Sequence, residues 1–170
     1  MEQLSVAIRF LIAVLAQVLV CKHIILFTDE FTYGTILFYP IFIILLPLRY
    51  SKSVILLLSF ILGLSVDIFY DSPGVHASAS VFTAFIRPFF LRILEPDSGY
   101  SIQSIPSKHY YGIIWFMQYA AYLLLAHLFF YFSVEAFSFV FFKQIVLKTL
   151  VTFGLSYMII VIHQMLVNSK

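Results

Sequence analysis

The sequence predicts an all-α, polytopic membrane protein, on the basis of its apolar composition and of long apolar runs separated by short polar breaks. Apolar residues make up 62% of the 170 positions and charged residues only 11%, against about 45–50% and about 25% in an ordinary soluble domain. A soluble fold of this composition would expose large apolar patches, which soluble monomers avoid. A bilayer removes that conflict, because each helix needs about 20 apolar residues to cross about 30 Å of hydrocarbon.

Six apolar runs have the length of membrane spans, and together they predict one integral membrane domain over residues 1–170. The predicted spans cover residues 4–27, 31–48, 53–70, 75–94, 110–134 and 144–167. The breaks between them are rich in polar and turn-forming residues, and Pro73 followed by Gly74 predicts a type II turn between the third and fourth spans. The aromatic segment 135–143 is predicted to lie in the membrane interface.

The distribution of basic residues predicts the orientation. The N-terminus lacks a basic stretch and its apolar run exceeds that of a signal peptide, so it reads as a retained span. With this end in the cytoplasm, the cytoplasmic segments contain Arg49, Lys52, Arg92, Lys108 and Lys170, while the outer segments contain Lys22 and Lys143. Basic residues favour the cytoplasmic side, so six spans place both termini in the cytoplasm.

Several classes of function find no support in the composition. A net charge of +2 does not indicate nucleic-acid binding, and the single cysteine, Cys21, excludes an internal disulfide and a cysteine-rich metal centre. The histidines His76, His127 and His163 lack the spacing of metal ligands. We therefore expect no catalytic residue, metal or cofactor. Tyrosines near the span ends are expected to anchor the chain in the headgroup zone; they are Tyr33, Tyr39, Tyr50, Tyr70, Tyr100, Tyr110 and Tyr111.

The segment from Gly63 to Arg92 is the most informative part of the sequence. Gly63 and Asp67 are four residues apart and share one helix face. Glycine allows a neighbouring helix to approach closely, and the carboxylate can then reach a polar partner across that contact. A charged carboxylate at mid-membrane costs about 2.5–3.5 kcal/mol on insertion scales. Asp67 is therefore a candidate for helix packing or partner binding, even though it lies near the outer end of its span.

The polar residues that follow Asp67 allow two interpretations. Asp67 and Asp71 could form a paired-carboxylate acid/base site; the favoured interpretation is that Asp71 closes the turn while Asp67 bonds a neighbouring helix. His76 could pair with either carboxylate, and it is expected to be a hydrogen-bonded residue at a helix start. Ser78 belongs to a run of small residues that permits close packing.

The basic residues of the later spans are expected to reach the membrane surface. Arg87 and Arg92 are expected to snorkel and to contact anionic lipid at the cytoplasmic end of the fourth span, with docking of a cytoplasmic partner as the alternative. Lys148 is expected to snorkel to the outer surface, and a neutral His127 to bond a neighbouring helix.

The stretch from Pro40 to Arg92 resembles the MreD family, and in particular the form found in Bacteroidota. The resemblance rests on motifs in a shared order: Tyr39-Pro40 opening the second run, the basic loop 49–52, the Gly63-x-x-x-Asp67 helix, the turn 72–74, His76-Ala77, and Arg87-Pro88 with the segment 97–100. Many family members have Ser or Gly where this chain has Asp71.

The resemblance implies a six-helix bundle similar to the substrate-binding subunit of energy-coupling-factor transporters. It also implies a non-enzymatic scaffold of the cell-wall elongation machinery that binds MreC, a single-span protein. Through MreC such a scaffold connects MreB filaments to RodA and to a penicillin-binding transpeptidase, and so helps to control cell shape. The alternatives are a membrane subunit that binds a vitamin-like small molecule, and an intramembrane aspartyl peptidase, which needs carboxylates from two helices. The candidate packing or partner-binding residues are Gly63, Asp67, Asp71, Pro73, Gly74, His76, Ser78, Arg87 and Arg92.

Overall fold

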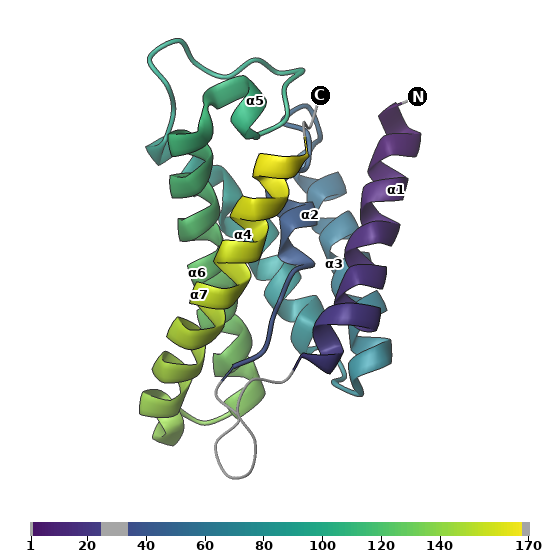
Figure 1. Ribbon diagram of the computed structural model, residues 1–170, viewed down its shortest axis with the longest axis vertical. Coiled ribbons are helices and arrows are strands. Elements are labelled where there is room, and N and C mark those ends of the chain that lie inside the picture. The colour runs from purple at the N-terminus through teal and green to yellow at the C-terminus, as the bar shows by residue number, and fades with distance from the viewer. Residues whose placement is uncertain (1, 25–33, 168–170) are drawn as a thin grey trace.

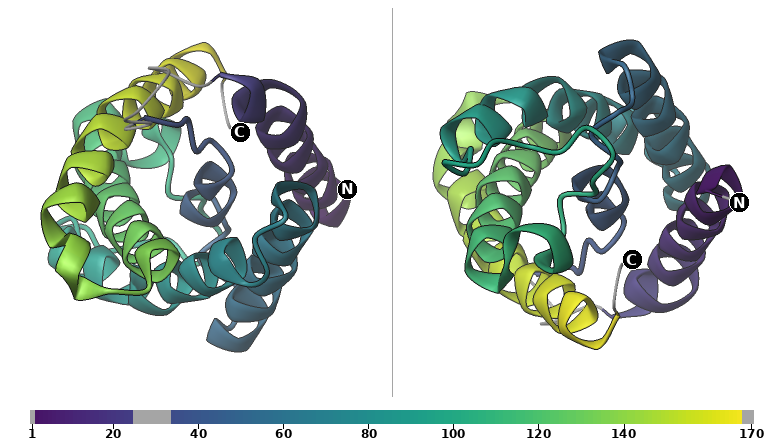
Figure 2. Two further views of the ribbon diagram at one scale, coloured as in Figure 1. Left: turned by 90° about the horizontal axis from the view of Figure 1, so that it is seen from below. Right: turned by 90° about the horizontal axis from the view of Figure 1, so that it is seen from above.

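Five long helical segments surround one short central helix in the computed structural model, which describes residues 2–24 and 34–167 (Figure 1). The long segments are α1 (Glu2–Leu15), which continues as a π-helix (Ala16–Val20) and a 3-10 turn (Cys21–His23), α3 (Lys52–Tyr70), α4 (Val75–Ile93), α6 (Ile113–Ala136) and α7 (Phe142–Leu166). Seen along the bundle, they form a ring around α2 (Pro40–Ile44) (Figure 2).

The chain is a multi-pass membrane protein. Four helical segments are long and apolar enough to cross a bilayer, namely Leu4–His23, Lys52–Tyr70, Ile113–Ala136 and Phe142–Leu166. Leucine, isoleucine and phenylalanine side chains cover the outside of these helices, where hydrocarbon rather than water would surround them. Helix α4 is as long as α3, at 19 residues, and packs between α3 and α6. Its inner face is more polar, because it carries the buried residues His76, Ser80, Thr83 and Arg87.

The prediction of a long helix over residues 31–48 is wrong for the part that the structure describes. From Thr35 to Phe38 the chain has no regular helix, and α2 covers only Pro40–Ile44. Proline has no backbone N–H to donate and is best placed in the first turn of a helix, so Pro40 begins a helix and does not continue one. The segment nevertheless runs lengthwise through the ring, which is why its hydropathy resembles that of a span (Figure 1). The predicted break at 28–30, together with Tyr33 and Lys170, lies outside the described residues.

Side chains of the surrounding helices bond the backbone of this irregular segment. The carboxamide of Gln17 donates to the carbonyl of Ile36 at 3.0 Å and accepts from the N–H groups of Phe38 and Tyr39 at 2.7 and 3.3 Å. On the opposite side, the hydroxyl of Ser156 accepts from the N–H of Leu37 at 2.9 Å. Irregular backbone at membrane depth is tolerated only where protein encloses it, and these bonds meet that condition.

Arg87 occupies the other end of α2, which corrects the prediction that it snorkels to lipid. Its side chain is fully buried. Nε donates to the hydroxyl of Tyr119 at 2.9 Å, and the other end of the guanidinium donates to the carbonyl of Leu46. Tyr119 in turn donates to the carbonyl of Ile44 at 3.4 Å. The carbonyl of Leu46 and the hydroxyl of Tyr119 thus hold the guanidinium inside the bundle.

The two ends of the bundle differ in their number of basic residues. Helix α1 begins and α7 ends at the same end of the molecule (Figure 1). That end also contains the start of α3 with Arg49 and Lys52, the end of α4 with Arg92, and Lys108 of α5 (Lys108–Tyr111). The opposite end contains Lys22, Lys143 and Lys148. This distribution matches the one from which the orientation is predicted.

The connection between α4 and α6 folds back over the basic end of the ring. Ser104 and Ser107 are buried there, and the carbonyl of Ser104 accepts from the N–H of Leu48 at 3.1 Å. Tyr100 donates to the carbonyl of Leu91 at 2.7 Å, and burial raises the pKa of its hydroxyl to about 12. The connection is therefore attached both to α4 and to the segment that follows α2.

The turn between α3 and α4 sets how closely these helices pack. The N–H of Val75 bonds the carbonyl of Ser72 at 3.4 Å, and Gly74 lies at φ 87° and ψ −1°, which confirms the predicted type II turn. The helices then approach until a Cβ on Gly63 would lie 2.6 Å from the backbone nitrogen of Ala77 and closer still to its Cα. Gly63 thus lies in the helix contact that its spacing from Asp67 predicts.

Gly63→Ala should destabilise the protein by about 1–3 kcal/mol or more, because the added methyl group meets backbone, which cannot rotate away. Gly154→Ala is the matched control, since a Cβ on Gly154 in α7 meets nothing within 4 Å, and it should be neutral or slightly stabilising. Thermal unfolding of both variants in the same detergent measures the difference. Equal midpoints would contradict the close contact of α3 and α4.

Candidate functional site

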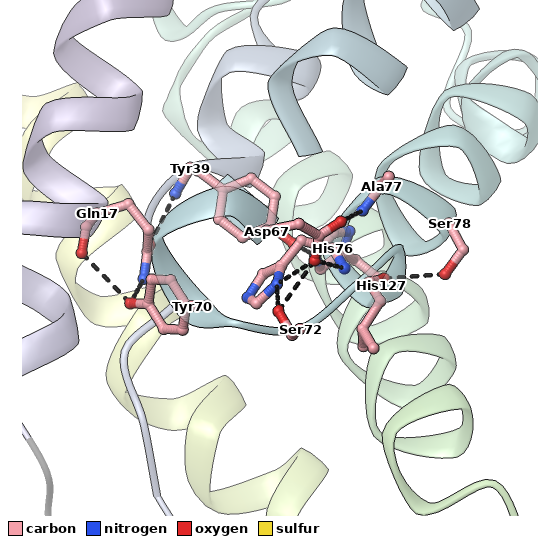
Figure 3. A network of polar contacts seen from close by, with 10 residues as sticks. Gln17, Tyr39, Asp67, Tyr70, Ser72, His76, Ala77, Ser78 and His127 are labelled. Carbon is pink, nitrogen blue, oxygen red and sulfur yellow. Dashed lines mark hydrogen bonds and ion pairs between the residues drawn. The ribbon is translucent and has the colours of Figure 1, made fainter. Parts of the chain in front are cut away.

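Asp67 bridges α3 and the start of α4 (Figure 3). Its Oδ1 accepts from the backbone N–H of His76, and its Oδ2 accepts from that of Ala77, both at 2.9 Å. The residue at the N-cap of α4 is Gly74, which has no side chain to cap the helix, so Asp67 supplies the cap from the neighbouring helix. The partial positive charge of a helix N-terminus stabilises a carboxylate, which offsets the cost of burying this one at 4% exposure.

Two more donors fix the carboxylate of Asp67. The hydroxyl of Ser72 lies 3.0 Å from Oδ1, and Nδ1 of His76 lies 3.0 Å from the same oxygen. An ionised carboxylate accepts only, so the imidazole places its proton on Nδ1 to make this bond. The four donors come from the α3–α4 turn and from the first turn of α4, so the cluster joins two helices at the position of closest approach.

Three tyrosine rings surround the imidazole of His76. The ring centroids of Tyr70, Tyr131 and Tyr39 lie 4.8, 4.9 and 5.6 Å from that of His76, and His76 itself is fully buried. These rings come from α3, α6 and the residue before α2. His76 therefore contacts α3, α6 and the central segment before α2, and its position depends on all three.

A second polar chain lies next to the first, around His127 of α6. The hydroxyl of Tyr39 lies 2.8 Å from Nε2 of His127, and the hydroxyl of Thr83 lies 2.7 Å from Nδ1. Thr83 also donates to the carbonyl of Ala79 at 2.7 Å. Since that bond uses the only proton of Thr83, Nδ1 of His127 donates to Thr83 and its Nε2 accepts from Tyr39. Every group in this chain has a partner within the protein.

The remaining predicted residues lie on the outside of the cluster. Asp71 is exposed and takes a left-handed conformation at φ 52° where α3 ends, so it closes the turn and is not part of the Asp67 hydrogen-bond network. Pro73 and Gly74 are exposed in the turn itself. The hydroxyl of Ser78 donates to the carbonyl of Val75 in its own helix, and Arg92 is exposed at the end of α4. Where α6 ends and α7 begins, Lys148 pairs with Glu135 at 3.1 Å on the surface.

Gln17 and Tyr39 are the main residues of the site that sequence reasoning missed. Gln17 is a fully buried polar residue within an apolar run, and that contrast is a signal that could have found it. Its Nε2 also bonds the hydroxyl of Tyr70 at 2.7 Å, so it connects α1 to the ring of tyrosines. Tyr39 was expected in the headgroup zone, as one of the tyrosines near the span ends, but it is fully buried between His76 and His127.

An apolar groove opens sideways between α1 and α3, away from the polar cluster. Its volume is about 700 Å³. Val6, Ala7, Phe10 and Leu11 form one wall, and Val54, Leu58 and Ile61 form the other, with Phe42 and Tyr50 completing the lining. A smaller groove of about 380 Å³ lies over α6 and α7, and its lining includes Tyr122, Ala126 and Leu150. Both grooves are lined mainly by helices that are long and apolar enough to cross a bilayer.

The chain has no match among protein-family models, curated proteins or solved structures. Its function must therefore be argued from the geometry of the polar cluster and of the two grooves. The hydrogen bonds of Asp67 are all directed to groups of the α3–α4 junction. The chemistry that this arrangement supports is the fixing of helices against one another.

Asp67→Ala should cost at least about 2 kcal/mol of folding free energy, because it leaves the buried N–H groups of His76 and Ala77 without acceptors, at about 1–3 kcal/mol each. Asp67→Asn should fall between Asp67→Ala and the unaltered protein, since the amide keeps one acceptor oxygen. Lys148→Ala is the control: it removes a partly exposed ion pair and should cost at most about 1 kcal/mol. Chemical unfolding in detergent measures all three. A loss for Asp67→Ala no greater than that for Lys148→Ala would rule out the capping role.

Proposed function

We propose that this protein is a non-enzymatic scaffold of the bacterial inner membrane, which binds the transmembrane helix of a single-span partner. The observation that carries the proposal is the apolar groove between α1 and α3. Its two walls follow helical spacing, at Val6 and Phe10 on α1 and at Val54, Leu58 and Ile61 on α3. Rows of side chains at this spacing form the ridges between which another helix packs, and small residues such as Ala7 let helices approach in lipid.

The packing of α1 supports a partner at this position. Near its C-terminal end, α1 is attached to the ring by the four bonds of Gln17, by Lys22 donating to the carbonyl of Phe69, and by the contact of Lys22 with the ring of Tyr70. Towards its start, Leu4, Ile8 and Leu11 are exposed. Exposed apolar side chains continue along this segment to Leu19 and Val20, and a helix added at the groove would bury those near the start of α1.

The resemblance of residues 40–92 to the MreD family gives the partner and the process. On that basis the partner is an MreC-like single-span protein, and the complex joins MreB filaments to RodA and to a penicillin-binding transpeptidase during cell-wall elongation. The arrangement would have six crossings, with α4 and the segment 34–48 crossing in addition to the four long apolar helices. Both termini would be cytoplasmic, since the end with Arg49, Lys52, Arg92 and Lys108 is the more basic.

Filling the groove should abolish partner binding and cell-shape control together. In rod-shaped cells depleted of the native protein, the unaltered chain should restore both the rod shape and co-purification of the MreC-like protein. Ala7→Trp should restore neither, because the indole occupies the groove. Ala126→Trp makes the same substitution in the smaller groove and should behave as the unaltered chain. Rod shape without the protein would overturn the scaffold proposal. Loss of binding with Ala126→Trp but not with Ala7→Trp would assign the partner to α6 and α7.

The orientation can be tested separately with single cysteines. Replacing the buried Cys21 with serine gives a cysteine-free chain, into which Asp71→Cys or Asp97→Cys is introduced. Both sites are exposed and lie in connections between helices, at opposite ends of the bundle. A membrane-impermeant maleimide added to spheroplasts should label the cysteine at position 71 and not the one at position 97. The reverse pattern would mean that both termini lie outside the cytoplasm.

A further inference from the structure

A small cleft that contains two opposite charges lies where α6 ends and α7 begins, away from the end of the bundle where α1 begins (Figure 1). Its volume is about 210 Å³, below the roughly 300–1,000 Å³ of pockets that enclose drug-sized molecules. Its lining mixes apolar with polar side chains and includes Phe132, Phe141, Ile145, Glu135, Gln144 and Lys148. Unlike the two apolar grooves, this cleft suits a small charged group.

The turn beside the cleft places it at the level of the lipid headgroups. Helices α6 and α7 are both long and apolar enough to cross a bilayer, so the connection between them lies at one membrane surface. In this connection Phe137 and Val140 are 93% and 87% exposed, more than any other large apolar side chain that the structure describes. Contact of such side chains with water is unfavourable, and the boundary between headgroups and acyl chains receives them. The cleft therefore opens among phospholipids.

The two charges of the cleft form an ion pair that can bind further groups. Nζ of Lys148 lies 3.1 Å from Oε2 of Glu135 and 5.7 Å from the centroid of the Phe132 ring, and both charged side chains are partly exposed. An ammonium has three donors and a carboxylate has two acceptor oxygens, so one bond between them leaves each able to make another. A ligand that complements both must carry a negative and a positive charge side by side.

The two charged residues reach the cleft from different depths. Glu135 is the last residue but one of α6, whereas Lys148 follows the first residue of α7 by six, which is about 9 Å along a helix axis. The lysine therefore approaches from the hydrocarbon side and the glutamate from the surface side. In a phospholipid the phosphate is attached to the glycerol that bears the acyl chains, and a headgroup amine lies beyond the phosphate. The order of charges along the cleft matches this order.

We propose that the cleft binds the headgroup of phosphatidylethanolamine, with the phosphate on Lys148 and the ammonium on Glu135. The ammonium donates to the carboxylate and the phosphate accepts from the lysine, as charge-assisted hydrogen bonds, and the carboxamide of Gln144 can donate to another phosphate oxygen. Phosphatidylglycerol has no cation for Glu135, and the cation of phosphatidylcholine has no N–H to donate. The site is separate from the α1–α3 groove and does not rest on the proposed scaffold function.

Native mass spectrometry on the full chain tests the proposal. The protein is incubated in detergent with equal amounts of phosphatidylethanolamine, phosphatidylcholine and phosphatidylglycerol that have the same acyl chains. Phosphatidylethanolamine should remain bound to the protein at least several-fold more often than either of the other two lipids. Equal retention of the three lipids, or preferential retention of phosphatidylglycerol, would overturn the proposal. This comparison decides the question on the unaltered protein, even where a variant folds poorly.

Variants separate lipid binding from the structural effect of the ion pair. Glu135→Gln should lower the retention of phosphatidylethanolamine to that of phosphatidylcholine, because the amide does not attract the ammonium. Glu135→Lys and Lys148→Glu in one chain keep an ion pair but reverse its direction, so the preference should be lost here too. Lys143→Met is the matched control, since Lys143 is exposed in the first turn of α7 and does not line the cleft. A preference that survives the charge reversal, or one that Lys143→Met abolishes, would contradict the assigned site.

Discussion

Lipid offers no hydrogen bonds, so each backbone N–H and C=O inside the bilayer needs a partner from the protein. The long helices meet this requirement within themselves. The segment through the middle of the ring does not, because Pro40 begins a short helix in place of a long one. Its N–H and C=O groups depend on Gln17, Ser156, Arg87 and Tyr119 from four different helices. The long helices surround the central segment at a distance from which these side chains can all reach it.

The junction of α3 and α4 follows the same requirement at a helix end. The first N–H groups of a helix have no partner within the helix, and here the N-cap residue is a glycine. Asp67 reaches across from α3 because Gly63 lets the two backbones nearly touch. Glycine and aspartate thus act as a pair: the glycine permits the approach, and the carboxylate fixes its distance and direction. The tyrosine rings that contact His76 connect this helix junction to α6 and to the central segment.

Local patterns in the sequence were sufficient for much of this architecture. Apolar run length predicted the helices over residues 53–70 and 75–94 to within a residue, and Pro73-Gly74 predicted the turn between them. Hydropathy could not show that residues 34–48 are irregular, because a segment enclosed by protein and a segment enclosed by lipid are equally apolar. Arg87 was misplaced for a related reason. A cation near a span end normally snorkels, and only the folded chain shows that the carbonyls after α2 lie beside it.

The central segment also has a consequence for the order in which the protein can be made. A ribosome delivers Gln17 before this segment, but Arg87 follows Leu46 by 41 residues and Ser156 follows Leu37 by 119. Until those residues emerge, the segment has only part of its hydrogen bonds and cannot rest stably in hydrocarbon. We therefore expect the segment to take its final place only after the later helices have been synthesised. The hydrogen bonds of the central segment are therefore complete only when α7, which is translated much later, packs against it.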